Sequence, residues 1–138
     1  MATYVKYESY VQFVANKEID AFGTTDTYKV AIASDAPAVT TDDELADATQ
    51  ITGTGYTAGG EDIQNDATRT GGTVTFTGVD VVWTAGAADW TAGRYILCHD
   101  DTSTTDKLQN YWDYGSNFTL GNGETFTVDF GASIWTLA

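Results

Sequence analysis

The residues best suited to chemistry in this chain gather between positions 98 and 106. Cys98 and His99 are its only cysteine and only histidine, and three aspartates follow at Asp100, Asp101 and Asp106. Neighbouring residues of a β-strand point to opposite faces, so the thiol of Cys98 and the imidazole of His99 cannot form a nucleophile and base pair. We therefore expect a small buried cysteine, a half-exposed histidine and no nitrogen–sulfur zinc site within one chain.

The three aspartates carry the hard oxygen ligands that Ca²⁺ prefers. Their spacing does not match the calcium loop of helix–loop–helix proteins, in which acids alternate, a glycine follows and a glutamate closes the loop. Asp100, Asp101 and Asp106 remain the calcium candidates, while a solvated acidic loop is the simpler interpretation. No other metal and no cofactor is predicted.

The remaining motifs do not define an active site. Gly53-Thr-Gly-Tyr-Thr-Ala58 fits a loose dinucleotide-binding pattern, but no helix start follows it and no nearby cation would balance a phosphate. We expect these glycines to shape a bend between strands instead. The chain has no G-x-S-x-G motif, and no pair of carboxylates is fixed at the separation that glycoside hydrolysis requires. We predict that the protein is not an enzyme and has no catalytic residues.

The element expected to organise the fold is the segment from Asn110 to Phe130. Its pattern predicts strand, turn and strand, with a break at Gly115-Ser116-Asn117. A three-residue loop, Gly121-Asn122-Gly123, would set Phe118 opposite Phe126 and keep the aromatic side chains on one face. By alternation, one face of the first strand carries Leu108, Trp112 and Tyr114.

Alternating and apolar runs predict further strands at 27–33, 73–84, 94–100 and 133–137, with a bulge or tight turn at Thr77-Gly78-Val79. Residues 94–100 are the most apolar and are expected at the centre of a sheet. One or two helical turns are expected after Thr41. These elements predict an all-β fold, a single-domain and jelly-roll-like β-sandwich with at most one or two short helices.

The predicted chain has two parts. Residues 1–20 are expected to form an N-terminal arm or a short helix, and residues 21–138 the β-sandwich domain. The aromatic side chains of the arm would pack either on their own domain or on a neighbouring protein. If they contact a neighbour, deletion of residues 1–15 should leave the domain folded. The partner-contact candidates are Tyr4, Tyr7, Tyr10 and Phe13.

Length and charge limit the classes of function. At 138 residues the chain fits one domain, and its hydrophobic content of 42% argues against disorder. The formal net charge of −14, with six Lys and Arg residues, opposes binding to nucleic acid and to anionic membranes. Such a charge suits a monodisperse protein or one that meets a basic partner. Neither a signal core nor a membrane-spanning run is apparent, so we expect synthesis in a cytoplasm.

Six segments carry a family resemblance in their order along the chain. They are Thr25-Asp-Thr-Tyr-Lys-Val-Ala-Ile32, Gly53-Thr-Gly-Tyr-Thr-Ala-Gly-Gly60, Val81-Val-Trp-Thr84, Arg94-Tyr-Ile-Leu97, Tyr111-Trp-Asp-Tyr-Gly115 and Gly123-Glu-Thr-Phe-Thr-Val-Asp-Phe130. In this order they resemble the small structural proteins of tailed bacteriophages. The resemblance implies a β-sandwich component of the virion that lacks catalytic residues.

The more specific expectation is a capsid decoration, or cement, protein on the outer shell of the virion, which clamps neighbouring subunits of the major capsid protein. An acidic surface suits the outside of a capsid, and the symmetric positions of a lattice favour a homodimer or homotrimer. No nucleic acid or membrane partner is expected. The alternatives are a tail or fibre component, and a carbohydrate-binding receptor-attachment module that would use exposed Trp90 or Tyr56.

Overall fold

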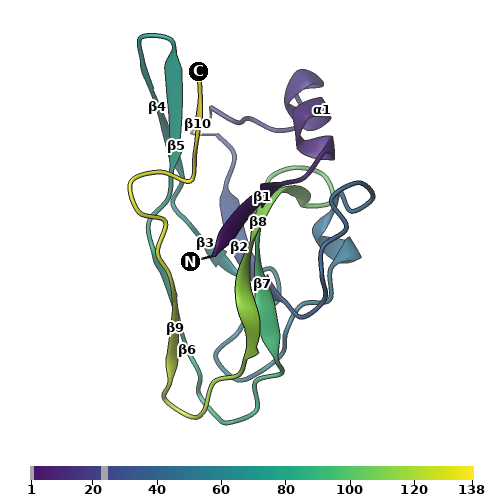
Figure 1. Ribbon diagram of the computed structural model, residues 1–138, viewed down its shortest axis with the longest axis vertical. Helices are drawn as coiled ribbons and strands as arrows, with labels where there is room; N and C mark the ends of the chain where they lie inside the picture. Colours follow the sequence, from purple (N-terminus) through teal and green to yellow (C-terminus); the bar gives the residue numbers. More distant parts are fainter. Residues whose placement is uncertain (1, 23–24) are drawn as a thin grey trace.

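The structure is a computed structural model that describes residues 2–22 and 25–138 (Figure 1). Residues 1, 23 and 24, the first of which belongs to the predicted arm, lie outside the described residues. The elements are β1 (Thr3–Lys6), α1 (Ser9–Ala15), β2 (Tyr28–Ala33), the 3₁₀ turn η1 (Leu45–Asp47), β3 (Glu61–Asp62), β4 (Asp66–Thr70), β5 (Thr73–Thr77), β6 (Val81–Thr84), β7 (Gly93–Asp100), β8 (Lys107–Phe118), β9 (Thr125–Val128) and β10 (Trp135–Leu137).

The strands form two facing layers. One layer is a five-stranded sheet in the order β1-β8-β7-β2-β3, and the other consists of the sheets β10-β5-β4 and β6-β9. Figure 1 shows these two smaller sheets one above the other along the long axis of the molecule. Strands account for 41% of the residues and helices for 7%, so the predicted all-β sandwich with little helix is confirmed. The apolar β7 lies in the middle of the larger sheet, as predicted.

The main core lies between the two layers. Tyr28, Val30 and Ile32 of β2, in the strand predicted at 27–33, are fully buried there on one face. From the opposite layer come Phe76 of β5 and Trp83 of β6. The rings of Tyr28 and Phe76 meet edge to face with centroids 5.1 Å apart, so aromatic contacts join the layers.

The chain changes sheet at Thr77-Gly78-Val79, where a bulge or tight turn was predicted. β5 pairs with β4 and β10, whereas β6 pairs with β9. A Cβ at Gly78 would lie 3.1 Å from Ile134 and 3.2 Å from Ile63, so glycine allows the chain to cross close to the core. Val79 is 54% exposed, whereas Val81 and Trp83 of β6 are buried.

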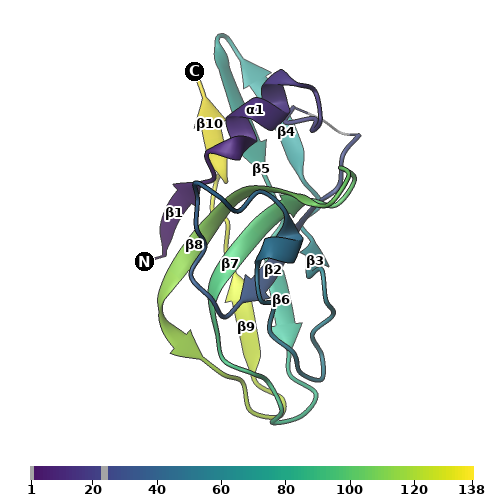
Figure 2. The ribbon, with the colours of Figure 1, turned by 90° about the vertical axis from the view of Figure 1, so that its right-hand side faces the viewer.

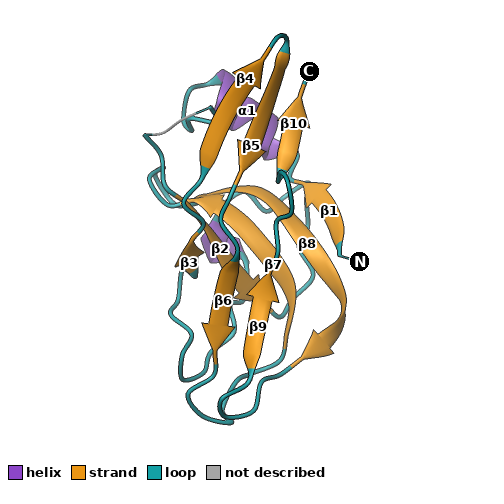
Figure 3. Ribbon diagram, turned by 90° about the vertical axis from the view of Figure 1, so that its left-hand side faces the viewer, coloured by secondary structure: helices purple, strands orange, loops and turns teal. Residues whose placement is uncertain are grey.

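The hairpin predicted between Asn110 and Phe130 is wrong. β8 continues through Gly115, which adopts a φ of 94°, and the chain then turns and crosses to the opposite layer. There β9 pairs with β6 and not with β8 (Figure 3). Phe118 and Phe126 do meet, stacked with centroids 4.2 Å apart. Their contact joins the two layers, because these two residues face each other across the core and are not cross-strand neighbours in one sheet.

A β-bulge in β8 changes the faces of its side chains. Cys98 of β7 pairs with Asn110 and His99 pairs with Leu108, which leaves Gln109 as the extra residue. The bulge shifts the alternation, so Leu108 lies on the outer face of the sheet, whereas Trp112 packs against the core between the layers. The prediction that these two residues share a face is therefore wrong.

The N-terminal segment is built into the sandwich. β1 pairs with β8 from Thr3 opposite Asp113 to Lys6 opposite Asn110, so it forms an edge of the larger sheet and not a detached arm. The predicted short helix follows as α1. The helix expected after Thr41 is reduced to the 3₁₀ turn η1.

Candidate functional site

An apolar groove lies between α1 and β10, where α1 faces the β10-β5-β4 sheet (Figure 2). It consists of two adjoining depressions of ≈ 590 Å³ and ≈ 480 Å³, which share residues of α1 and β10. We call it the α1–β10 groove. The residues that define it are Tyr4, Val11, Val14, Ala21, Trp135 and Leu137.

The helix beside the groove is apolar on two sides. Tyr10 and Phe13 point inward and are buried, whereas Val11 and Val14 are 54% and 40% exposed. A helix at the surface of a soluble protein normally turns a polar side outward. Leu137 of β10, at the opposite wall, is 63% exposed. Large apolar side chains thus reach the surface from both walls of the groove, a pattern typical of a binding surface.

Both strands that border the groove are edge strands. β1 pairs only with β8, and β10 pairs only with β5. An edge strand carries backbone N–H and C=O groups that are free to pair with an added strand. The groove therefore combines apolar side chains with strand edges at its margins.

The charge at the groove differs from that of the whole chain. Among the described residues that line it, the charged ones are Lys6, Lys17 and Asp20. Two of the six basic residues of a chain with net charge −14 are thus placed here. The ion pairs among the described residues use Lys29, Arg94 and Lys107 instead. The ammonium groups of Lys6 and Lys17 are available to a carboxylate of a partner.

The predicted partner-contact residues are mostly buried within the chain. Tyr7, Tyr10 and Phe13 are at most 7% exposed, which corrects their assignment as contacts to a neighbour. Their burial follows from the pairing of β1 with β8, which carries the segment onto the sheet. Gln109 donates a hydrogen bond of 2.8 Å to the hydroxyl of Tyr10. Tyr4 alone among the four is exposed, at 38%.

The groove residues Val11, Val14 and Leu137 were not predicted as a site. Helical spacing in the sequence includes Val11 and Val14, but it cannot show which side of a seven-residue helix is covered. The far wall comes from the last strand of the chain, and no local pattern places that strand beside the first helix.

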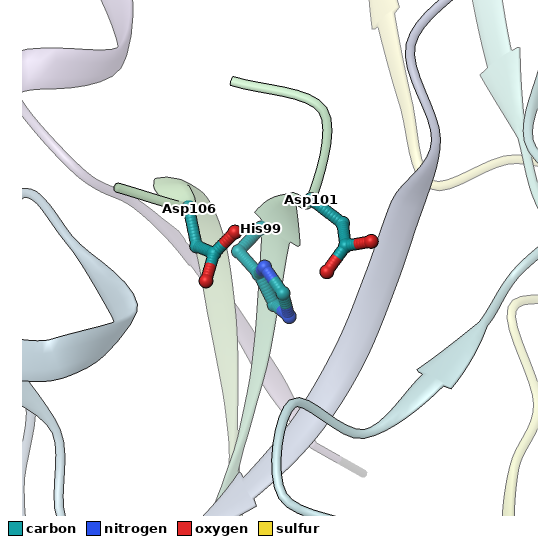
Figure 4. A group of neighbouring side chains, drawn as sticks. All are labelled: His99, Asp101 and Asp106. Carbon is teal, nitrogen blue, oxygen red and sulfur yellow. The ribbon is translucent and has the colours of Figure 1, made fainter. Parts of the chain in front are cut away.

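A second group of side chains gathers beside the loop that joins β7 and β8 (Figure 4). His99, Asp101 and Asp106 each offer one ligand atom, and these atoms all lie within 4.8 Å of one another. His99 is the last residue but one of β7, and the two aspartates stand at either end of the loop. Thr105 and Asp106 have φ angles of 68° and 53°, a left-handed turn that is costly for a β-branched residue.

His99 is fully buried, not half-exposed as predicted. Its Nε2 lies 2.9 Å from the carbonyl oxygen of Gly59, and its Nδ1 has no hydrogen-bond partner among the described residues. Burial lowers the pKa of His99, although Asp106 and Asp101 oppose this effect. Cys98 packs in the core between the layers, so its thiol and the imidazole of His99 do lie apart. Burial raises the pKa of the Cys98 thiol.

Asp100 does not lie in this group with the other two calcium candidates, Asp101 and Asp106. Its Oδ1 accepts hydrogen bonds from the backbone N–H groups of Thr102 and Ser103, at 2.9 and 3.1 Å. Burial and the nearby carboxyl of Asp26 raise the pKa of Asp100 to about 7. Of the three calcium candidates, Asp101 and Asp106 therefore lie together with His99, whereas Asp100 is outside this group, and calcium binding stays a prediction.

The two aromatic residues proposed for sugar binding pack against the core, Trp90 buried and Tyr56 half-buried. Trp90 is 6% exposed, and its Nε1 donates a hydrogen bond of 2.9 Å to the carbonyl oxygen of Thr54. The hydroxyl of Tyr56 accepts a hydrogen bond from the backbone N–H of Ile32 at 3.0 Å. Trp90 is thus buried, and Tyr56 is half-buried with its ring against Trp83 and Trp90, which corrects the expectation that both are exposed.

Comparisons with protein-family models, with curated proteins and with solved structures found no match. Within residues 2–22 and 25–138, no helix has the length and apolar character needed to cross a bilayer.

Proposed function

We propose that this chain is a non-enzymatic structural protein of a tailed bacteriophage virion. Its role is that of a decoration or cement protein on the outer capsid surface, where it clamps neighbouring subunits of the major capsid protein. The observation that carries the proposal is the α1–β10 groove, because an apolar surface with free strand edges is suited to protein binding and not to catalysis.

The occupant of the groove is an extended apolar segment of the shell protein that also bears carboxylates. Apolar side chains would fill the space between α1 and β10 next to Val14 and Leu137. The backbone of the segment would pair with an exposed edge, as in other complexes formed by strand addition. Carboxylates on the segment would pair with Lys6 and Lys17 at the margins.

The size of the molecule suits such a contact. A stable interface buries about 800 Å² on each partner. That area is roughly a ninth of the chain's surface of 7050 Å². Each chain would supply one groove. A homodimer or homotrimer at a symmetric position of the shell would therefore bind several capsid subunits at once.

A single charged substitution in the groove tests this function. Val14→Asp should weaken binding to purified shells that lack the chain by about tenfold or more, because it places a carboxylate in the apolar surface. Val82→Asp is the matched control, since Val82 is 57% exposed on β6 and does not line the groove. Binding is measured by co-sedimentation, and folding of both variants by thermal melting.

The proposal predicts that the wild type and Val82→Asp bind shells alike and that Val14→Asp does not. Equal binding by all three proteins, or no binding by the wild type, would contradict it. A change in oligomer mass caused by Val14→Asp, with shell binding unchanged, would assign the groove to self-association instead.

A further inference from the structure

The imidazole of His99 is held by one of its two nitrogens. Nε2 lies 2.9 Å from the carbonyl oxygen of Gly59, which can only accept a hydrogen bond, so Nε2 carries the proton. In the neutral ring, Nδ1 then bears the lone pair. The side chain is fully buried, and Nδ1 has no hydrogen-bond partner among the described residues. Burial of an acceptor without a hydrogen bond costs free energy, so a bound group that satisfies this nitrogen would stabilise the site.

The groups nearest to that nitrogen cannot supply a proton. Figure 4 shows the ring of His99 between the carboxylates of Asp101 and Asp106, and the three ligand atoms lie within 4.8 Å of one another. Ionised carboxylates accept hydrogen bonds and do not donate them. A ring nitrogen without a hydrogen-bond partner and two carboxylates thus lie together in one small group. A cation bound among them could be coordinated by all three side chains.

The donor set defines the class of cation. Ca²⁺ takes six or more oxygen ligands, whereas Zn²⁺ and related ions combine imidazole nitrogen with carboxylate oxygen. A histidine that binds a metal characteristically donates its other ring N–H to a carbonyl or carboxylate, as His99 does to Gly59. We propose that His99 Nδ1, Asp101 and Asp106 form a site for a divalent transition-metal ion of the zinc class, with water as a fourth ligand.

The side chains need little movement to close on the ion. Bonds of about 2.0–2.2 Å in a tetrahedral site place ligand atoms about 3.3–3.6 Å apart. Asp101 is exposed and Asp106 half-buried, so rotation of their side chains can bring the carboxylates inward while His99 stays fixed at the base. The bound ion would connect the two ends of the β7–β8 loop.

Lys29 competes for part of this site. Its Nζ lies 2.9 Å from Oδ2 of Asp101, which leaves Oδ1 of the same carboxylate for the metal. The positive charge of the ammonium group opposes the approach of a cation. Lys29→Met should therefore tighten metal binding several-fold, an effect opposite to that of removing a ligand.

The test uses the full chain, freed of metal with a chelator, and titrated with ZnCl₂ by calorimetry. We expect one Zn²⁺ per chain, at least a tenfold loss of affinity in Asp106→Asn and Asp101→Asn, and no loss in Glu8→Gln. Glu8 is the matched control, because its side chain is exposed and lies outside the cluster. In ¹⁵N spectra of the wild type, Zn²⁺ should shift the Nδ1 resonance of His99 while Nε2 stays protonated.

Failure of the wild type to bind one Zn²⁺ would overturn the proposal. So would equal affinity in Asp106→Asn and the wild type, or an Nδ1 resonance that does not move at saturation. Binding of Ca²⁺ but not Zn²⁺ would also overturn it, and would show that the site prefers a cation with oxygen ligands only. None of these outcomes depends on the shell-binding function, because neither aspartate lines the groove.

Discussion

At the scale of single residues, Gln109 has the widest effect. It is the extra residue of the β8 bulge, so it reverses which side chains face the core on either side of it. Its own side chain is fully buried and donates to the hydroxyl of Tyr10. Alternation in the sequence assumes a constant period of two, and nothing near Gln109 signals an extra residue. The wrong face for Leu108 follows directly from that assumption.

Asp100 is a second residue whose surroundings change its chemistry. Its folded-state pKa, raised to about 7, exceeds the ordinary value of about 4. A raised pKa means that the folded state binds the proton more tightly than the unfolded state. The stabilisation is therefore fully present below the unfolded pKa and is lost as the pH rises through about 7.

Asp100→Asn should remove this pH dependence. The amide stays neutral, keeps an oxygen for the N–H groups of Thr102 and Ser103, and has an N–H to offer Asp26. We expect a gain in the free energy of unfolding of about 1–3 kcal/mol at pH 8 and a clearly smaller gain at pH 5, where only part of the stabilisation has been lost. Urea denaturation at both pH values in the presence of a chelator measures it. An equal effect at the two pH values would show that Asp100 is not the titrating group.

At the scale of elements, the N-terminal segment differs most from expectation. Tyr7, Tyr10 and Phe13 are buried, and Tyr7 packs in the cluster with Leu97 and Leu108 on the outer face of the larger sheet. The sequence favoured a helix or arm, and helical spacing did reveal α1. It could not reveal β1, because an edge strand of four residues is specified by its partner β8.

Deletion of residues 2–15 should unfold the protein, contrary to the expectation from the sequence alone. Loss of each buried aromatic side chain costs about 3–5 kcal/mol, and three such losses are comparable with the total stability of about 5–15 kcal/mol of a typical domain. Thermal unfolding followed by circular dichroism measures the effect against the full chain. A cooperative transition that persists in the truncated chain would mean that the segment is a dispensable arm.

The strands of the last quarter of the chain were located better than they were paired. Most of β8 and all of β9 fall where alternation and turn residues placed them. Their partners could not be derived locally, because an adjacent pair of strands can form a hairpin or cross between layers with the same turn. The stacked rings of Phe118 and Phe126 satisfy both arrangements.

At the scale of the whole molecule, the fold class followed from local sequence patterns, whereas both candidate sites depend on contacts between distant segments. The groove joins the first helix to the last strand, and the metal-binding group needs Gly59 to orient His99. Short apolar runs with glycine-marked turns were sufficient to predict a sandwich. They carry no information on which edges stay free or which loop covers a histidine.

The copy number of this chain in purified phage particles tests the central claim most directly. Quantitative mass spectrometry would compare its peptides with those of the major shell protein. A decoration role on a symmetric lattice predicts a ratio on the order of one half to one. A ratio of roughly a few per cent would contradict that role and favour a tail or fibre component, because a protein that decorates a symmetric shell is present in many copies. Absence from the particles would contradict the virion function altogether.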